Sequence, residues 1–144
     1  MFSPGHAGAN AYARVGVETG VLGASPHRLV VMLYQGARKA IAHARMHLQQ
    51  GNVAERGVAV SKAIRIVESG LQQSLNVEAG GEVAQRLNAL YTYMTRRLLE
   101  ANITQSEAML VEVDGLLATL EEAWIGIAPE IARMAEKPPA EVMR

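Results

Sequence analysis

Two histidines four residues apart are the strongest candidates for chemistry in this sequence. His43 and His47 would share one face of a helix, as the two zinc-binding histidines of an HExxH metalloprotease do. That pattern also needs a glutamate directly after the first histidine, and Ala44 occupies the position. The chain has no cysteine and no well-placed acidic residue to complete a zinc site. We therefore predict solvent-facing histidines, no metal site and no cofactor.

Other catalytic patterns are incomplete as well. The serines lie outside the strand-turn-helix context of a nucleophile elbow. Gly80 and Gly81 are not followed by Lys-Ser or Lys-Thr, so they do not form a phosphate-binding loop. The absence of cysteine excludes thiolate catalysis and disulfides. The sequence therefore gives no support for an enzyme.

The composition predicts one domain of closely packed helices. The 144 residues are 49% hydrophobic but include only one Trp, four Tyr and one Phe. Fourteen basic and fourteen acidic residues balance, which argues against a nucleic-acid binder. No apolar run approaches the roughly 20 residues needed to span a bilayer, and the first residues lack the features of a secretory signal. We expect a cytoplasmic protein without membrane or nucleic-acid partners.

Apolar residues recur three and four positions apart through four segments, as in amphipathic helices. The first segment has a sharp start. Ser25 can cap the free N–H groups of a helix, and Pro26 at the first helical position loses no hydrogen bond. Gly51 tolerates the left-handed conformation that ends many helices. The first helix is therefore expected over residues 26–50.

Three further helices follow at short intervals. They are expected over about residues 53–75, over about residues 82–101, and from a capping box at Thr104-x-x-Glu107 to a stop at Pro129. Short connections force successive helices to run antiparallel, so we predict an all-α fold, an antiparallel up-down four-helix bundle. The expected organisation is a flexible glycine-rich N-terminal segment at 1–24, the bundle at 25–128 and a short C-terminal tail at 129–144.

Charge balances over the whole chain but not locally. The region between Gly20 and Ala54 holds four basic residues and no acidic one, and the region from Gln105 to Glu130 holds six acidic residues and no basic one. One interpretation is that the first and fourth helices are neighbours whose flanks attract each other. The other is that two faces serve different partners, and the sequence does not decide between them.

The first and third helices carry more apolar residues than a bundle needs. Residues 29–34 are six consecutive apolar or aromatic residues, whereas a bundle helix needs about three or four per two turns. Tyr93 and Leu99 lie outside the main apolar stripe of the third helix. These residues either pack beneath the glycine-rich N-terminal segment or form a surface for a partner.

Five stretches of the sequence resemble the flagellin export chaperone (FliS) family. In order they are Val17-Glu18-Thr19, the run from Ala24 to Ala37, the block from Gly80 to Ala84, the run from Leu87 to Asn102, and the closing stretch from Leu116 to Trp124. The resemblance thus spans nearly the whole chain.

Two positions depart from the family pattern. Residues 20–23 look like an insertion before the Ala-Ser-Pro element. Gln35 stands where the family commonly has aspartate, which puts in doubt any charged contact at that position.

The resemblance implies a chaperone that binds the disordered C-terminal segment of flagellin. It would prevent premature polymerisation and deliver its client to the flagellar type III export apparatus, with other flagellar proteins as further candidate clients. The family's N-terminal segment can occupy part of the client groove, and Tyr12 matches its characteristic aromatic residue. The predicted client-binding residues are Tyr12, Tyr34, Leu90, Tyr91, Tyr93, Met94, Arg96 and Arg97.

Core packing is the alternative for each apolar or aromatic candidate of the helices, and an equal one for Leu90, Tyr91 and Met94. These candidates are Tyr34, Leu90, Tyr91, Tyr93 and Met94. Solvated positions are the alternative for the two arginines. Tyr91 and Tyr93 lie about 200° apart around a helix, so one of them must face outward. We expect that residue to be Tyr93.

A second function remains open at this point. The chain could be a helical adaptor or oligomeric assembly protein without a flagellin client, which buries its surplus apolar surface by self-association. A chaperone is expected to be a monomer or a weak homodimer instead.

Overall fold

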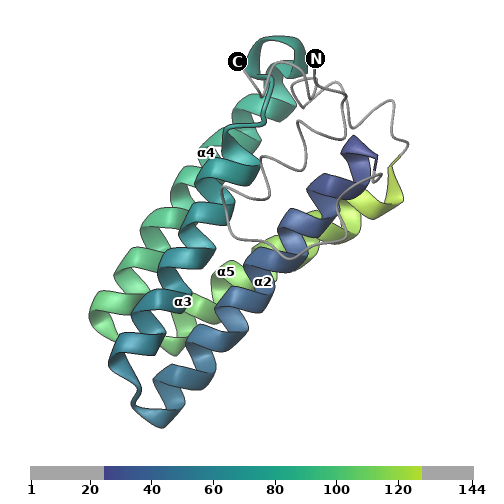
Figure 1. Cartoon of the computed structure of the whole chain (residues 1–144). Helices are drawn as coiled ribbons and strands as arrows, with labels where there is room; N and C mark the ends of the chain where they lie inside the picture. Colours follow the sequence, from purple (N-terminus) through teal and green to yellow (C-terminus); the bar gives the residue numbers. More distant parts are fainter. Residues whose placement is uncertain (1–24, 128–144) are drawn as a thin grey trace, which may run out of the picture.

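The computed structural model describes residues 25–127 of the 144-residue chain. Within that range the chain forms helices and no β-strand. In order they are α2 (Pro26–Gln50), α3 (Val53–Arg65), the π-helical segment η1 (Ile66–Gln72), α4 (Val77–Thr104) and α5 (Glu107–Gly126) (Figure 1). The prediction of an all-α four-helix bundle is confirmed. The predicted N-terminal segment, the C-terminal tail and Tyr12 lie outside the described residues.

The helices run alternately up and down, and each packs on its neighbours in the chain (Figure 1). α2 packs against α3 and α5, and α4 packs against α3, η1 and α5, so that α2 and α4 lie diagonally opposite. The α2–α3 contact is the most extensive. Ala37 and Ala44 of α2 and Ala63 of α3 are wholly buried. None of the described helices is long and apolar enough to cross a membrane.

The ends of α2 follow the prediction from the sequence. The backbone N–H of Arg28 donates to the Ser25 hydroxyl oxygen at 3.1 Å, so the serine satisfies a free N–H of the first turn. Gly51 has φ 74° and closes the helix in the left-handed region.

The predicted capping box of the last helix is wrong. Thr104 is the last residue of α4, and its hydroxyl donates to the Glu100 carbonyl oxygen at 2.8 Å. Ser106 caps α5 instead, accepting from the Met109 backbone N–H at 3.2 Å. Gln105, at φ 55°, makes the left-handed turn between the two helices. The connection therefore consists of Gln105 and Ser106 and lies later in the chain than a cap at Thr104 would place it.

The second predicted helix changes geometry partway. It is α-helical to Arg65 and π-helical from Ile66 to Gln72. Gly70 lies in the π-helical part, directly against α2. A Cβ atom at this position would come within 2.8 Å of a Leu33 methyl carbon, so only glycine allows this approach without a shift of the leucine.

The third helix begins earlier than predicted. Asn76 caps it at Val77, and its side-chain oxygen accepts from the Ala79 N–H at 3.1 Å. Gly81 then kinks the helix with φ 57° and ψ −135°. The expected start at residue 82 therefore marks this kink, because the glycine that was expected to break the chain bends it instead.

Candidate functional site

The surface between α2 and α5, here called the α2–α5 seam, is joined by ion pairs at seven-residue spacing. Arg38 donates from Nε to Asp114 Oδ1 and from Nη1 to Glu121 Oε1, both at 3.0 Å. One heptad away, Arg45 Nη2 lies 3.4 Å from Glu107 Oε1. Two of the four basic residues of the first helix region thus pair across this seam with three acidic residues of the fourth helix, which confirms the interpretation that these helices are neighbours.

Two glutamines donate hydrogen bonds to carboxylates of the same seam. Gln35 Nε2 donates to Glu121 Oε2 at 3.2 Å, and Gln49 Nε2 donates to Glu107 Oε1 at 2.6 Å. At position 35 an amide donates to the carboxylate of Glu121, whereas an aspartate would repel it.

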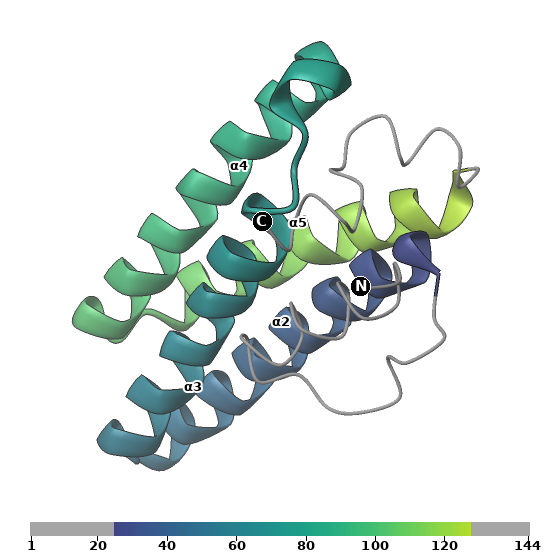
Figure 2. The same cartoon turned by 45° about the horizontal axis from the view of Figure 1, so that its top comes forward.

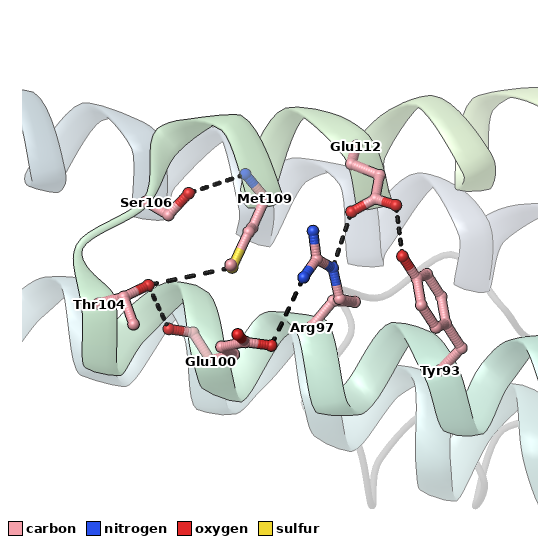
Figure 3. A network of polar contacts seen from close by, with 7 residues as sticks. All are labelled: Tyr93, Arg97, Glu100, Thr104, Ser106, Met109 and Glu112. Atoms are coloured by element: carbon pink, nitrogen blue, oxygen red, sulfur yellow. Dashed lines mark hydrogen bonds and ion pairs between the residues drawn. The ribbon is translucent and has the colours of Figure 1, made fainter.

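The opposite flank of α5 meets α4 at a second surface, the α4–α5 seam (Figure 3). There the Tyr93 hydroxyl donates to Glu112 Oε2 at 2.5 Å, and Arg97 Nε donates to Glu112 Oε1 at 2.8 Å. Arg97 also lies 3.5 Å from Glu100 Oε2, and its guanidinium carbon is 5.8 Å from the centre of the Tyr93 ring. We call Tyr93, Arg97, Glu100 and Glu112 the Glu112 network.

The hydrogen bonds of this network shift the titration of its members. The bond from Tyr93, followed by the bond from Arg97, lowers the pKa of Glu112 below its ordinary value because both stabilise the carboxylate. The same bond raises the pKa of Tyr93 above 10.0, because the hydroxyl proton is held by a negative acceptor. Near neutral pH the network therefore contains a charged carboxylate and a neutral phenol.

The structure separates the two tyrosines of the third predicted helix as expected. Tyr91 is wholly buried, whereas Tyr93 is 41% exposed, so the prediction that Tyr93 faces outward is confirmed. Arg96 is exposed and Arg97 is half-buried in the Glu112 network. Their part in client binding stays a prediction.

Three other predicted client contacts lie in the core. Tyr34 on α2 and Tyr91 on α4 are wholly buried, and their hydroxyl oxygens are 2.5 Å apart across the bundle diagonal. Met94 is also wholly buried, and Leu90 is half-buried against the edge of the core. These positions fit the alternative of core packing, and client contact by Tyr34, Tyr91 or Met94 would require the bundle to open.

The additional apolar residues of α2 pack inside the molecule. Five of the six residues from Leu29 to Tyr34 are buried, and Met32 is partly buried against the core. The large apolar side chains that remain exposed are concentrated on α4, which contributes half of those in the described residues. They are Val77, Val83, Tyr93, Leu99 and Ile103. Among these, the sequence singled out Tyr93 and Leu99 by their position outside the main stripe.

Among the described residues, the histidine pair does not form a site with other potential ligands. His43 is exposed, and His47 is half-buried with its Nδ1 atom 3.2 Å from the Asn52 side-chain nitrogen. No cluster of three potential metal ligands occurs within residues 25–127.

Sequence reasoning missed Glu112, which connects two predicted client contacts. It is one of six acids in its region, and nothing in the sequence distinguished it from its neighbours. A usable signal is the four-residue spacing of Tyr93 and Arg97, which places a phenol and a guanidinium on one face of α4. One acid on a neighbouring helix can then accept from both.

Comparison with known proteins gives one consistent result. The family model described as flagellar protein FliS matches residues 8–131. The flagellar secretion chaperone FliS of Salmonella typhimurium is 49% identical over 123 residues, which cover 85% of this chain and 91% of the relative. Its counterpart in Escherichia coli is 44% identical over 117 residues, covering 81% and 86%. The flagellar secretion chaperone FliSB of Pseudomonas aeruginosa is 40% identical over 117 residues, covering 81% and 92%.

Proposed function

Because this chain belongs to the FliS family of flagellar proteins, we propose that it is an export chaperone for the disordered C-terminal segment of flagellin. The bound client is kept from polymerising in the cytoplasm and is delivered to the flagellar type III export apparatus. Other flagellar proteins are further candidate clients. The family is one of chaperones rather than enzymes, in agreement with the lack of catalytic patterns in the sequence.

The exposed apolar side chains of α4 are the observation that best supports client binding. Val83 is 61% exposed, Leu90 is half-buried, and Tyr93 is 41% exposed. Their separations of seven and three residues place them on one side of the helix. An amphipathic client helix uses the same spacing for its own apolar contacts. We propose that one client helix lies along this strip of α4, beside α5.

We expect the client to fold as it binds to this strip, and this folding should be visible in the thermodynamics of binding. A disordered segment must become ordered when it binds, so part of the interaction free energy is used for that ordering. Saturable binding should therefore be accompanied by a gain in helicity and a negative heat-capacity change.

The experiment is calorimetric titration of the full chain with a peptide that covers the C-terminal segment of the same organism's flagellin. Circular dichroism of the mixture should show more helix than the sum of the components. Absence of binding at tens of micromolar peptide, where a coupled-folding interface still registers, would refute the client assignment.

A pair of matched substitutions tests where the client lies. Val83→Glu places a charge on the α4 strip and should weaken binding by about tenfold or more, since a buried unpaired charge is costly. Val58→Glu makes the same change on α3, at a side chain of similar exposure, 69%, and should leave affinity unchanged. Equal effects of both substitutions would contradict the proposed location.

Family membership favours the chaperone over an adaptor or assembly protein of another system. The expected oligomeric state, a monomer or weak homodimer, stays a prediction. Sedimentation velocity over a range of concentrations tests it, and a stable larger assembly would favour the alternative.

A further inference from the structure

Both carboxylate oxygens of Glu112 are used to hold side chains of α4 (Figure 3). Oε2 accepts from the Tyr93 hydroxyl at 2.5 Å, and Oε1 accepts from Arg97 Nε at 2.8 Å. The guanidinium of Arg97 lies over the Tyr93 ring, 5.8 Å from its centre. The ring is thus held at its hydroxyl and on one face.

The held ring is still accessible to a partner. Tyr93 remains 41% exposed, although its hydroxyl is engaged. An exposed side chain on a helix ordinarily samples several rotamers, and its immobilisation by a ligand costs free energy. At Tyr93 the Glu112 carboxylate restricts that freedom before any partner arrives.

The network also lies where α4 and α5 begin to separate. The two helices are joined at the turn between Thr104 and Ser106 and diverge away from it (Figure 2). Of the interactions drawn in Figure 3, the bond between Tyr93 and Glu112 is the farthest along α4 from this turn. Farther along α4 on the same side are Leu90 and Val83, the apolar strip of the proposed client site. The Tyr93 ring therefore lies at the end of the strip that is nearest the turn between α4 and α5.

We propose that Glu112 is a positioning residue for client binding, which holds the Tyr93 ring and the Arg97 guanidinium in the orientation that the flagellin segment contacts. This inference rests on the proposed function. Glu112 itself touches no client atom in this scheme. Its contribution is that two α4 side chains are ordered in advance, so the client does not have to order them.

The test is a double-mutant cycle in full-length protein, with the flagellin C-terminal peptide as the probe and calorimetry as the readout. Glu112→Ala removes the bonds that hold the Tyr93 hydroxyl and Arg97 Nε, although Arg97 keeps its contact with Glu100. It should weaken binding by about three- to tenfold, the range expected for losing the preorganisation of one or two side chains. Tyr93→Phe keeps the ring but removes its anchor, and should have a similar effect. The double variant should be little weaker than Glu112→Ala alone, because Tyr93→Phe removes a bond that Glu112→Ala has already removed.

Further variants separate positioning from charge and from general stability. Glu112→Gln keeps an oxygen that accepts from Tyr93 but loses the ion pair with Arg97, so its affinity should lie between those of the wild type and Glu112→Ala. Glu122→Ala removes an exposed carboxylate from the same helix and should bind like the wild type. The unfolding free energy of each variant, measured in denaturant, shows whether a loss of affinity arises from loss of fold.

The outcomes distinguish the two proposals. If the wild type binds and Glu112→Ala binds equally well or more tightly, the positioning role is wrong and the chaperone function stands. Additive effects of Glu112→Ala and Tyr93→Phe would also overturn it, since the residues would then act independently. If the wild type itself does not bind the peptide, the proposed function fails first.

Discussion

The two flanks of α5 are held to the bundle in different ways. On the α2 side, ion pairs and glutamine hydrogen bonds recur from Glu107 near the start of the helix to Glu121 near its end. On the α4 side, the Glu112 network lies within the first two turns of α5. The two helices diverge beyond it (Figure 2).

The two seams therefore differ in the function that we infer for them. The α2–α5 seam pairs opposite charges along the length of the two helices. The α4–α5 seam joins the two helices near the turn between them. Beyond it, apolar side chains of α4 are half-buried or exposed. We infer that the first seam contributes mainly to the stability of the bundle and the second mainly to the proposed binding of a client. The predictions below test that division.

The largest effect is expected in the hydrophobic core, to which α5 contributes Leu117. Leu117 of α5 is wholly buried, so Leu117→Ala should lower the free energy of unfolding by about 3 kcal/mol. Val111→Ala on the same helix alters a side chain that is 44% exposed and should cost less than about 1 kcal/mol. Denaturant unfolding followed by circular dichroism measures both. Similar losses of unfolding free energy for the two variants would show that α5 is not held to the bundle by the face that carries Leu117.

A smaller effect is expected at the α2–α5 seam. Arg38→Met keeps an apolar stem but removes the partner of Asp114 and Glu121. It should lower the unfolding free energy by about 1 kcal/mol, the upper range for partly exposed ion pairs that form a network. Added salt should reduce the difference from the wild type, because it screens the lost attraction.

The control for this seam is an ion pair within one helix. Arg86→Met removes the pair with Glu82, whose side chains are 79% and 73% exposed, and should change stability by less than about 0.5 kcal/mol. Peptide affinity of Arg38→Met should equal that of the wild type. A loss of affinity without loss of stability would contradict the assignment of this seam to stability.

The sequence predicted the bundle because the signals for its helices are local. Apolar spacing, the Ser25-Pro26 start and the Gly51 end each depend on neighbouring residues alone. The predictions from the sequence were wrong or incomplete where tertiary contacts determine the local structure. Gly81 bends a helix that it was expected to precede, and Gly70 lies in a π-helical segment against Leu33, for which the sequence pattern gives no sign.

The candidate site was only partly predictable. Helical geometry separated Tyr93 from Tyr91, and the segregation of charge indicated the α2–α5 contact. Glu112 could not be identified, because its importance depends on which acid of α5 lies opposite Tyr93 and Arg97. That choice depends on the register between α4 and α5, which the short Gln105 turn sets.

The smallest expected effect is a dependence of the α4–α5 seam on pH. The folded protein lowers the pKa of Glu112 through the bond from Tyr93 and then that from Arg97, so the unfolded chain binds a proton more readily at this residue. The carboxylate therefore contributes stability above the ordinary glutamate pKa of about 4.3, and this contribution is lost as pH falls through the lower folded value. The difference in unfolding free energy between the wild type and Glu112→Gln should accordingly shrink from neutral toward acidic pH.

The cause of this shift can be tested separately in the folded protein. Carboxyl-carbon NMR should place the titration midpoint of Glu112 below the ordinary glutamate value in the wild type and closer to it in Tyr93→Phe. The return should be incomplete, because Arg97 still donates to the carboxylate. An unchanged midpoint in Tyr93→Phe would mean that Arg97 governs the pKa of Glu112. Both flanks of α5 would then be held by ion pairs of one kind, and the hydroxyl of Tyr93 would have no part in fixing its ring for a client.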